Sequence, residues 1–184
     1  MKIACVLKPS HEYDTDYVDH FLRGVLKHVG DYEFLLVGGS EWPGWWSKME
    51  LFRPDITGDL LYFDLDTMIV GNIDDIMAVN TLTVLSDFNI LNRMASGMMF
   101  IPEKERAFIW EEWIKNPKAH MEQWGGLGDG GFLSQYWGHA ARWQDLVPGQ
   151  IVSYKKHCLE GVPSDARVVC FHGRPRPRDV RWRI

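Results

Sequence analysis

The sequence predicts a single α/β domain in which helices flank a mostly parallel central sheet. Three observations point to this class. The chain has 184 residues, the length of one ordinary domain. Strand-like and helix-like runs alternate along its first half, as βαβ units require. No stretch rich in Pro, Gly or Ser interrupts the chain, so residues 1–184 are expected to fold as one unit.

The first half of the chain alternates strand and helix. Residues 2–8 contain a run of only five apolar residues, which is too short for the core of a signal peptide and predicts a buried strand. Residues 17–29 carry apolar side chains at helical spacing and predict an amphipathic helix. Residues 32–39 predict a second strand, and residues 45–52 predict a short helix that ends before Pro54.

The second half follows the same two patterns. Further strands are predicted at residues 59–66, 81–88, 96–102 and 166–173. A helix is predicted at residues 131–138, behind a glycine-rich loop. Another is predicted at residues 103–116, with these side chains pointing inward: Phe108, Ile109, Trp110 and Trp113.

The composition argues against two classes of protein. Hydrophobic residues make up 46% of the chain and its formal net charge is −5, which does not suit a general nucleic-acid binder. No window reaches the roughly 18 consecutive apolar residues of a membrane helix, so no transmembrane segment is expected. The three cysteines form no Cys-x-x-Cys pair, which favours a reducing compartment, and we expect the protein in the cytoplasm.

The last eleven residues are rich in arginine. The arginines are Arg174, Arg176, Arg178, Arg181 and Arg183. Such a tail is either a solvated terminus or a contact for an anion such as phosphate. Composition alone leaves both interpretations open.

Two aspartates, Asp64 and Asp66, stand where the predicted strand 59–66 ends. Alternate residues of an extended chain point to one side, so both carboxylates are expected to face one point. That point lies at the carboxyl edge of the sheet, where open α/β folds bind ligands. A cation such as Mn²⁺ or Mg²⁺ would neutralise the pair. Alternatively Asp64 ends the strand and Asp66 begins a turn, and an isolated Asp-x-Asp does not decide between these interpretations.

Haloacid-dehalogenase phosphatases also carry Asp-x-Asp after an apolar strand. Their pattern continues with Thr or Val two residues after the second Asp. Here Thr67 follows Asp66 immediately, and Met68 stands at that position. The predicted strand is also the third of the chain and not the first. The match therefore fails where phosphatase chemistry needs it.

Residues 47–76, SKMELFRPDITGDLLYFDLDTMIVGNIDDI, resemble glycosyltransferase family 8, the glycogenin-like retaining glycosyltransferases. That family places a Lys on a short helix, then a strand ending Tyr-x-Asp-x-Asp-Thr, then Asn-Ile-Asp. The matching residues keep this order and spacing: Lys48, Tyr62, Asp64, Asp66, Thr67, Asn72, Ile73 and Asp74. The chain looks like a short, divergent member, and the resemblance implies a GT-A fold for residues 1–184.

Weaker matches to the same family follow along the chain. The matched positions are Asp87, Gly97, Asp129, Gly131, Gly173 and Arg176. The chain departs from the family at three places, because Ala95, Gly130 and Ser134 stand where the family has Asn, Gln and Asn. These departures remove polar groups that would contact the sugar, so the identity of the sugar stays open.

The third metal ligand in this family is a histidine near the end of the chain. Alignment on Gly173 puts Cys170 at that position, with His172 two residues later on the same side of a predicted strand. A hard cation held by carboxylates prefers imidazole to thiolate. We therefore expect His172 to complete the site, with Cys170 as the alternative.

The resemblance implies a hexosyltransferase that moves a sugar with retention from a nucleotide-sugar, chiefly a UDP-sugar. Mn²⁺ or Mg²⁺ would be held by Asp64, Asp66 and His172. The nucleotide-sugar would contact Tyr13, Lys48, Asp64, Asp87, Ser96, Gly97, Gly173 and Arg176. Asp129 would lie at the reacting sugar as the catalytic carboxylate. The acceptor could be a glycan, a lipid-linked group or a protein.

Two further hypotheses come from the sequence. A catalytically silent nucleotide-sugar-binding domain on the same fold is the alternative to an enzyme, because three polar family positions are changed. The chain also has nine tryptophans, which either pack in the core or stack on sugars. Trp124, before the glycine-rich loop, is the expected candidate for stacking.

Overall fold

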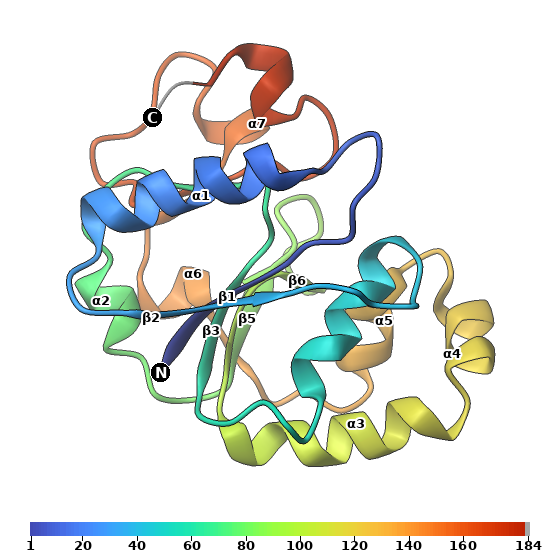
Figure 1. The fold of residues 1–184 in the computed structure, drawn as a ribbon. Helices are drawn as coiled ribbons and strands as arrows, with labels where there is room; N and C mark the ends of the chain where they lie inside the picture. The colour runs from blue at the N-terminus through green and yellow to red at the C-terminus, as the bar shows by residue number, and fades with distance from the viewer. Residues whose placement is uncertain (183–184) are drawn as a thin grey trace.

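A computed structural model describes residues 1–182, so Arg183 of the arginine-rich tail lies outside the described residues. Its main sheet has six strands in the order β2-β1-β3-β6-β5-β7 (Figure 1). Their bounds are β1 Lys2–Val6, β2 Glu33–Val37, β3 Leu60–Phe63, β5 Thr83–Ser86, β6 Met94–Ile101 and β7 Ala141–Arg142. Only β6 runs against its neighbours in this sheet, among the strands the structure describes. The predicted mostly parallel sheet of an α/β fold is confirmed.

A smaller sheet lies beside the main one and was not predicted. Its strands, in the order β4-β9-β8, are β4 Thr67–Ile69, β8 Ile151–Ser153 and β9 Val168–Cys170. The predicted strand 59–66 is too long, because β3 ends at Phe63 and the amide of Thr67 closes a turn on the carbonyl of Asp64 at 3.0 Å. Residues 64–66 therefore cross from the large sheet to the small one.

Helices cover the large sheet on both faces (Figure 1). The α-helices are α1 Thr15–His28, α2 Asp74–Met77, α3 Arg106–Lys115, α4 Pro117–Trp124, α5 Gly128–Ser134, α6 Trp143–Leu146 and α7 Tyr154–His157. The 3₁₀ helices are η1 Gly44–Phe52, η2 Glu103–Glu105 and η3 Pro177–Val180.

Two predicted helices differ from the observed ones. The helix expected at 103–116 begins with the short turn η2, and Phe108, expected inward, is 52% exposed. The helix expected at 131–138 begins three residues earlier, at Gly128. Asn116 starts α4 because its side chain accepts a hydrogen bond from the amide of Ala119 at 3.1 Å.

The core forms two layers because the side chains of the strands alternate. Ile3 and Cys5 of β1 face α1, whereas Ala4 and Val6 face η1, α3 and α5. Gly24 lets α1 approach the small sheet, since a Cβ there would lie 2.9 Å from the carbonyl oxygen of Ile69. Both layers thus hold the carboxyl ends of β1 and β3 in place.

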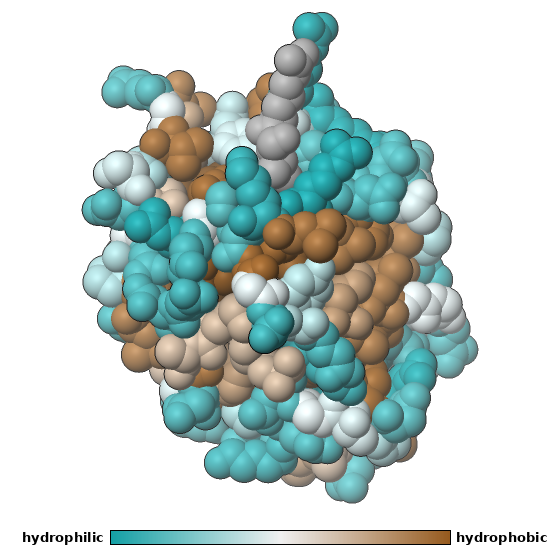
Figure 2. All heavy atoms as spheres, turned by 60° about the vertical axis from the view of Figure 1, so that its left-hand side comes forward, coloured by the Kyte–Doolittle hydropathy of each residue, from teal (hydrophilic) through white to brown (hydrophobic). Residues whose placement is uncertain are grey.

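Strand β2 is an edge of the large sheet, and its Leu36 is 43% exposed. Figure 2 shows apolar side chains gathered in a broad band on the side of the molecule that carries α1, α2 and the start of β2.

The described helices, across residues 1–182, include none that is both long and apolar enough to cross a bilayer.

Candidate functional site

A pocket of about 900 Å³ opens beyond the carboxyl ends of β1 and β3. It contains all the site residues expected from the sequence: Tyr13, Lys48, Asp64, Asp66, Asp87, Ser96, Gly97, Asp129, His172, Gly173 and Arg176. Cys170 lines it as well. The fold therefore brings residues that are up to 163 positions apart in the sequence into one pocket, at the place where open α/β sheets bind ligands.

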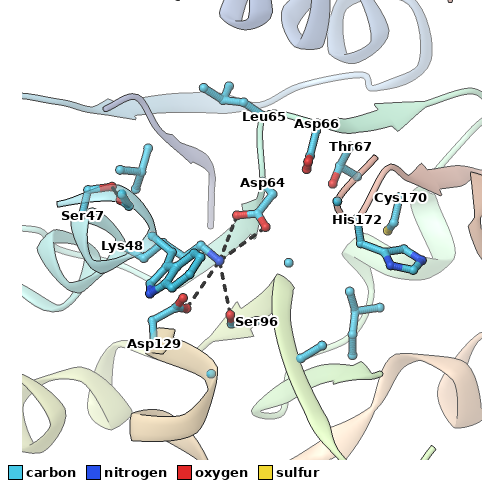
Figure 3. Close-up of a pocket in the computed structure, with 18 of the residues that line it drawn as sticks. Ser47, Lys48, Asp64, Leu65, Asp66, Thr67, Ser96, Asp129, Cys170 and His172 are labelled. Carbon is cyan, nitrogen blue, oxygen red and sulfur yellow. Dashed lines mark hydrogen bonds and ion pairs between the residues drawn. The ribbon is translucent and has the colours of Figure 1, made fainter. Parts of the chain in front are cut away.

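One end of the pocket is built around a buried ammonium group. Lys48 Nζ lies 3.1 Å from Asp64 Oδ1, 3.4 Å from Asp129 Oδ2 and 3.2 Å from the hydroxyl of Ser96 (Figure 3). We call these four residues the Lys48 cluster. They come from η1, the end of β3, β6 and α5, so every member is fixed by a different packed element.

The charges of the Lys48 cluster compensate one another. Burial alone would lower the pKa of Lys48, but the carboxylates of Asp129 and Asp64 outweigh it and raise that pKa. Burial raises the pKa of Asp129, and the nearby ammonium offsets part of the rise. Lys48 is therefore charged at neutral pH and holds two carboxylates that would otherwise repel each other.

Backbone and side-chain contacts fix Asp64 at the end of β3. Its amide donates to the carbonyl of Gly97 at 2.8 Å, and the hydroxyl of Tyr62 donates to its Oδ1 at 2.6 Å. A Cβ at position 97 would lie 3.3 Å from Asp64 Oδ2, so the glycine makes room for the carboxylate. Tyr62 and Gly97, both expected from the resemblance, thus position Asp64.

The other end of the pocket is built around a guanidinium group. Arg176 Nη1 contacts Asp66 Oδ2, and its Nη2 lies 3.4 Å from Glu12 Oε2. The hydroxyl of Tyr13 donates to Asp66 Oδ2 at 2.9 Å, and the guanidinium lies 5.1 Å from the centre of the Tyr13 ring. These four residues form the Arg176 cluster. They come from turn 64–66, the loop after β1 and the C-terminal segment.

Asp66 is buried and close to a like charge. Burial first, and then the charge of Asp64, raise the pKa of Asp66 from 3.8 to about 7, although Arg176 opposes the rise. The ionised carboxylate is therefore costly in the fold as it stands, and positive charge in the pocket would stabilise it.

The ring of His172 is turned away from the two aspartates (Figure 3). Its Nε2 lies 2.7 Å from the hydroxyl of Ser153, and the ring stacks on Phe88 with 5.3 Å between centroids. Burial and then the charge of Lys155 lower the pKa of His172, so the ring is neutral at neutral pH. Cys170 is buried, and burial raises the pKa of its thiol.

A divalent cation fits the chemistry of only part of this donor set. Asp64 and Asp66 offer carboxylate oxygens to one pocket, which are the ligands that Mn²⁺ and Mg²⁺ prefer. Over residues 1–182, however, no three His, Cys, Asp or Glu side chains converge as metal ligands do. The structure brings the two aspartates to the pocket but does not bring His172 to them.

Asp87 lies at the rim of the same pocket in an ion pair that the sequence did not suggest. Arg93 Nε donates to Asp87 Oδ2 at 3.0 Å, and the amides of Asn89 and Ile90 donate to Oδ1. Burial would raise the pKa of Asp87, but these hydrogen bonds outweigh it and lower that pKa. As placed, Asp87 is a turn-stabilising carboxylate that also faces the pocket.

Three residues that line the pocket were not assigned to the site from the sequence: Glu12, Trp45 and Arg93. Each depends on segments that meet only in the fold, and no spacing rule marks them. Trp124, the tryptophan expected to stack on a sugar, instead packs against Gly131 in the core layer of α3 and α5. Trp45 lines the pocket in its stead.

Several solved structures with a similar fold are glycosyltransferases. Apo GlyE from Streptococcus pneumoniae TIGR4 superposes with a TM-score of 0.68 at 13% identity, over 99% of this chain and 56% of that one. An active-site mutant of LgtC superposes with a TM-score of 0.70 at 11% identity, over 96% of this chain and 89% of that one. The galactosyltransferase LgtC with donor and acceptor sugar analogs gives 0.69 at 12% identity, again over 96% and 89%.

These likenesses identify the fold as that of the GT-A glycosyltransferases, as expected from the resemblance. The chain spans little more than half of the GlyE structure, so the rest of that protein has no counterpart in these 184 residues. No protein-family model matches the sequence, and no curated protein matches it either.

Proposed function

We propose that this protein is a glycosyltransferase that moves a sugar from a nucleotide-sugar, chiefly a UDP-sugar, to an acceptor with retention at the anomeric carbon. The observation that carries this proposal is the pocket itself. On a GT-A fold it combines an Asp-x-Asp turn with a buried lysine, an arginine and a third carboxylate. A diphosphate with a sugar attached needs this combination of cations and fixed hydrogen-bonding groups.

A divalent cation, Mn²⁺ or Mg²⁺, would be held by Asp64 and Asp66, with His172 as the third ligand expected from the resemblance. When bound, it would supply Lewis-acid stabilisation of the charge on the leaving diphosphate. The high pKa of Asp66 supports this role, since a carboxylate whose charge is unfavourable in the free protein gains most from a cation.

The protein's own residues would divide the remaining work between the two ends of the pocket. Arg176 can donate two parallel hydrogen bonds to a phosphate, and Gly173, with φ of 71°, adopts a backbone conformation that favours glycine. Asp129, fixed by Lys48, would lie at the reacting sugar or its hydroxyls. Tyr13 would contact the nucleotide, and Ser96 and Asp87 the sugar.

Titration calorimetry with a panel of UDP-sugars, in Mn²⁺ and then in EDTA, tests this proposal. We expect one donor to bind only with the cation, and to release UDP when a matching acceptor is added. Binding that survives EDTA unchanged would remove the cation from the proposal. Asp66→Asn and His172→Ala should each abolish the cation-dependent binding, whereas Cys170→Ala should keep it. The opposite result would make Cys170 the ligand.

A second candidate is a domain that binds a nucleotide-sugar without turning it over. Ala95 and Gly130 offer no polar side chain to the pocket, and the hydroxyl of Ser134 donates to the carbonyl of Gly131 at 2.7 Å. The three changed positions thus present little to a sugar. Cation-dependent binding without UDP release on any acceptor would favour this candidate.

A further inference from the structure

Trp45 stands at the pocket with most of its surface in solvent. It is 55% exposed, and the other tryptophans of the chain, all within residues 1–182, are buried or half-buried. Its neighbour Trp46 is 5% exposed and stacks on Trp113 with 5.3 Å between ring centroids. Two adjacent tryptophans thus have opposite environments, and burial does not explain the one that lines the pocket.

The start of α5 packs directly against the Trp45 side chain. Gly128, with φ of 64°, begins α5 directly against the indole, because a Cβ there would lie 2.7 Å from Trp45 Nε1. Any larger residue would push the ring away. The next residue back, Leu127, is 52% exposed and also lines the pocket. Trp45 and Leu127, which we call the Trp45 platform, form a preformed apolar surface at the wall.

The Trp45 platform adjoins the Lys48 cluster. Trp45 precedes Lys48 by three residues in η1, and Leu127 precedes Asp129 by two at the start of α5. Figure 3 shows Ser47, Lys48 and Asp129 on one side of Asp64, with Asp66, Cys170 and His172 on the other. The Trp45 platform therefore lies at the end of the pocket opposite the guanidinium of Arg176.

We propose that the Trp45 platform binds a pyranose ring of the acceptor. A pyranose presents C–H groups on one face and hydroxyls around its edge, so it suits an apolar indole with charged groups beside it. This inference rests on the proposed function. There the diphosphate goes to Arg176 and the donor sugar to Asp129, which leaves the acceptor beyond Asp129, at the Trp45 platform.

The competing occupant is the nucleobase of the donor, because a base would also stack on an indole. The arrangement of charges favours the sugar. A base at Trp45 would place the phosphates beside Asp64 and Asp129, away from Arg176, and the only cation within 4 Å of those carboxylates in residues 1–182 is Lys48.

Saturation-transfer difference NMR tests the inference with two sets of probes. The first set contains the methyl glycosides of glucose, galactose and N-acetylglucosamine and their disaccharides, and the second is UDP. The variants are Trp45→Ala, Trp45→Phe and, as a matched control, Phe108→Ala. Phe108 is 52% exposed and is not among the residues of the pocket. Circular dichroism checks that each variant keeps its fold.

We expect at least one glycoside to bind the wild-type protein through its C–H face. Trp45→Ala should weaken it about tenfold, and Trp45→Phe should restore most of the loss, since a single stacked ring contributes on this scale. Phe108→Ala should bind the glycosides and UDP as the wild type does. The loss in Trp45→Ala should fall on the glycoside and not on UDP.

Three outcomes would overturn the inference. In the first, Trp45→Ala weakens UDP binding as much as glycoside binding. In the second, Trp45→Ala leaves glycoside binding unchanged. In the third, the wild-type protein binds UDP but none of the glycosides. Failure of the wild-type protein to bind UDP at all, with or without Mn²⁺, would instead refute the proposed function. The two failures are therefore distinguishable.

Discussion

The two ends of the pocket hold their carboxylates in different ways. In the Lys48 cluster one ammonium lies between two carboxylates, and the side chain of Lys48 is only 10% exposed. In the Arg176 cluster the arginine comes from the C-terminal segment, and its partner Glu12 lies in a loop. One end is thus held by four packed elements, whereas the other joins the buried Asp66 to side chains from a loop and from the C-terminal segment.

Lys48→Met should have the largest effect, because it leaves two carboxylates without their cation. We expect the free energy of unfolding to fall by about 3–5 kcal/mol, as for other broken buried ion pairs. Urea unfolding at neutral pH measures it, and Asp129→Asn in the same chain should recover part of the loss. Lys115→Met is the control. Lys115 is 64% exposed and pairs with Glu112, so its substitution should lower the free energy of unfolding far less than that of Lys48. If Lys48→Met and Lys115→Met lowered the free energy of unfolding equally, the buried pair would contribute no more to stability than the exposed one.

Asp66→Asn should act in the opposite direction. The folded protein holds the Asp66 proton up to about pH 7 and the unfolded chain only up to about 3.8. The stability that this proton contributes is therefore complete below pH 4 and is lost as the pH rises to 7. At pH 8 we expect Asp66→Asn to be more stable than the wild type by about 2 kcal/mol, with the gain vanishing towards pH 4. Urea unfolding across this pH range measures it, and a gain that does not change with pH would contradict the assignment.

Arg176→Ala should show whether the second end serves a ligand. We expect it to weaken UDP binding about tenfold, which is the effect of losing one charge-assisted contact to phosphate. Arg174→Ala is the matched control, because it removes the same charge from a neighbouring residue that is not among those lining the pocket. Titration calorimetry compares the two. Equal weakening would mean that UDP responds only to the net charge of the segment.

Asp87→Asn should have the smallest effect. Its pair with Arg93 is partly exposed, so we expect a loss of about 0.5 kcal/mol at pH 7. The pKa of Asp87 is lowered in the fold, so this contribution is present above pH 4 and is lost as the pH falls below it. Urea unfolding of both proteins at pH 7 and pH 3 measures it. A difference that persists at pH 3 would show that the amide side chain, and not the charge, disturbs the turn.

The sequence predicted the elements with clear periodicity and missed most of the short ones. The helix at 17–29 and the strands at 2–8 and 32–39 match α1, β1 and β2 closely, because their apolar residues follow one period throughout. In the small sheet, β9 lies within the predicted strand 166–173, whereas the three-residue strands β4 and β8 are too short to show a period. The turn at 64–66 depends on the amide of Thr67, which carries no signal in the sequence.

The composition of the site was more predictable than its contacts. Lys48, Asp64 and Asp129 could be named from their spacing and from the resemblance, and all three meet in the pocket. The orientation of His172 could not, because it depends on Ser153 and Phe88, which lie on other segments. Motifs specify which residues approach one another, whereas the packing of distant segments decides which way a ring turns.

The crossing at residues 64–66 has a mechanical consequence. The chain leaves one sheet there and enters the other, and its two aspartates lie on either side of the seam. A ligand that contacts both carboxylates would link the two sheets, so its binding would also restrict motion of one sheet relative to the other. The rigidity of the β4-β9-β8 sheet would then depend on whether the pocket is occupied.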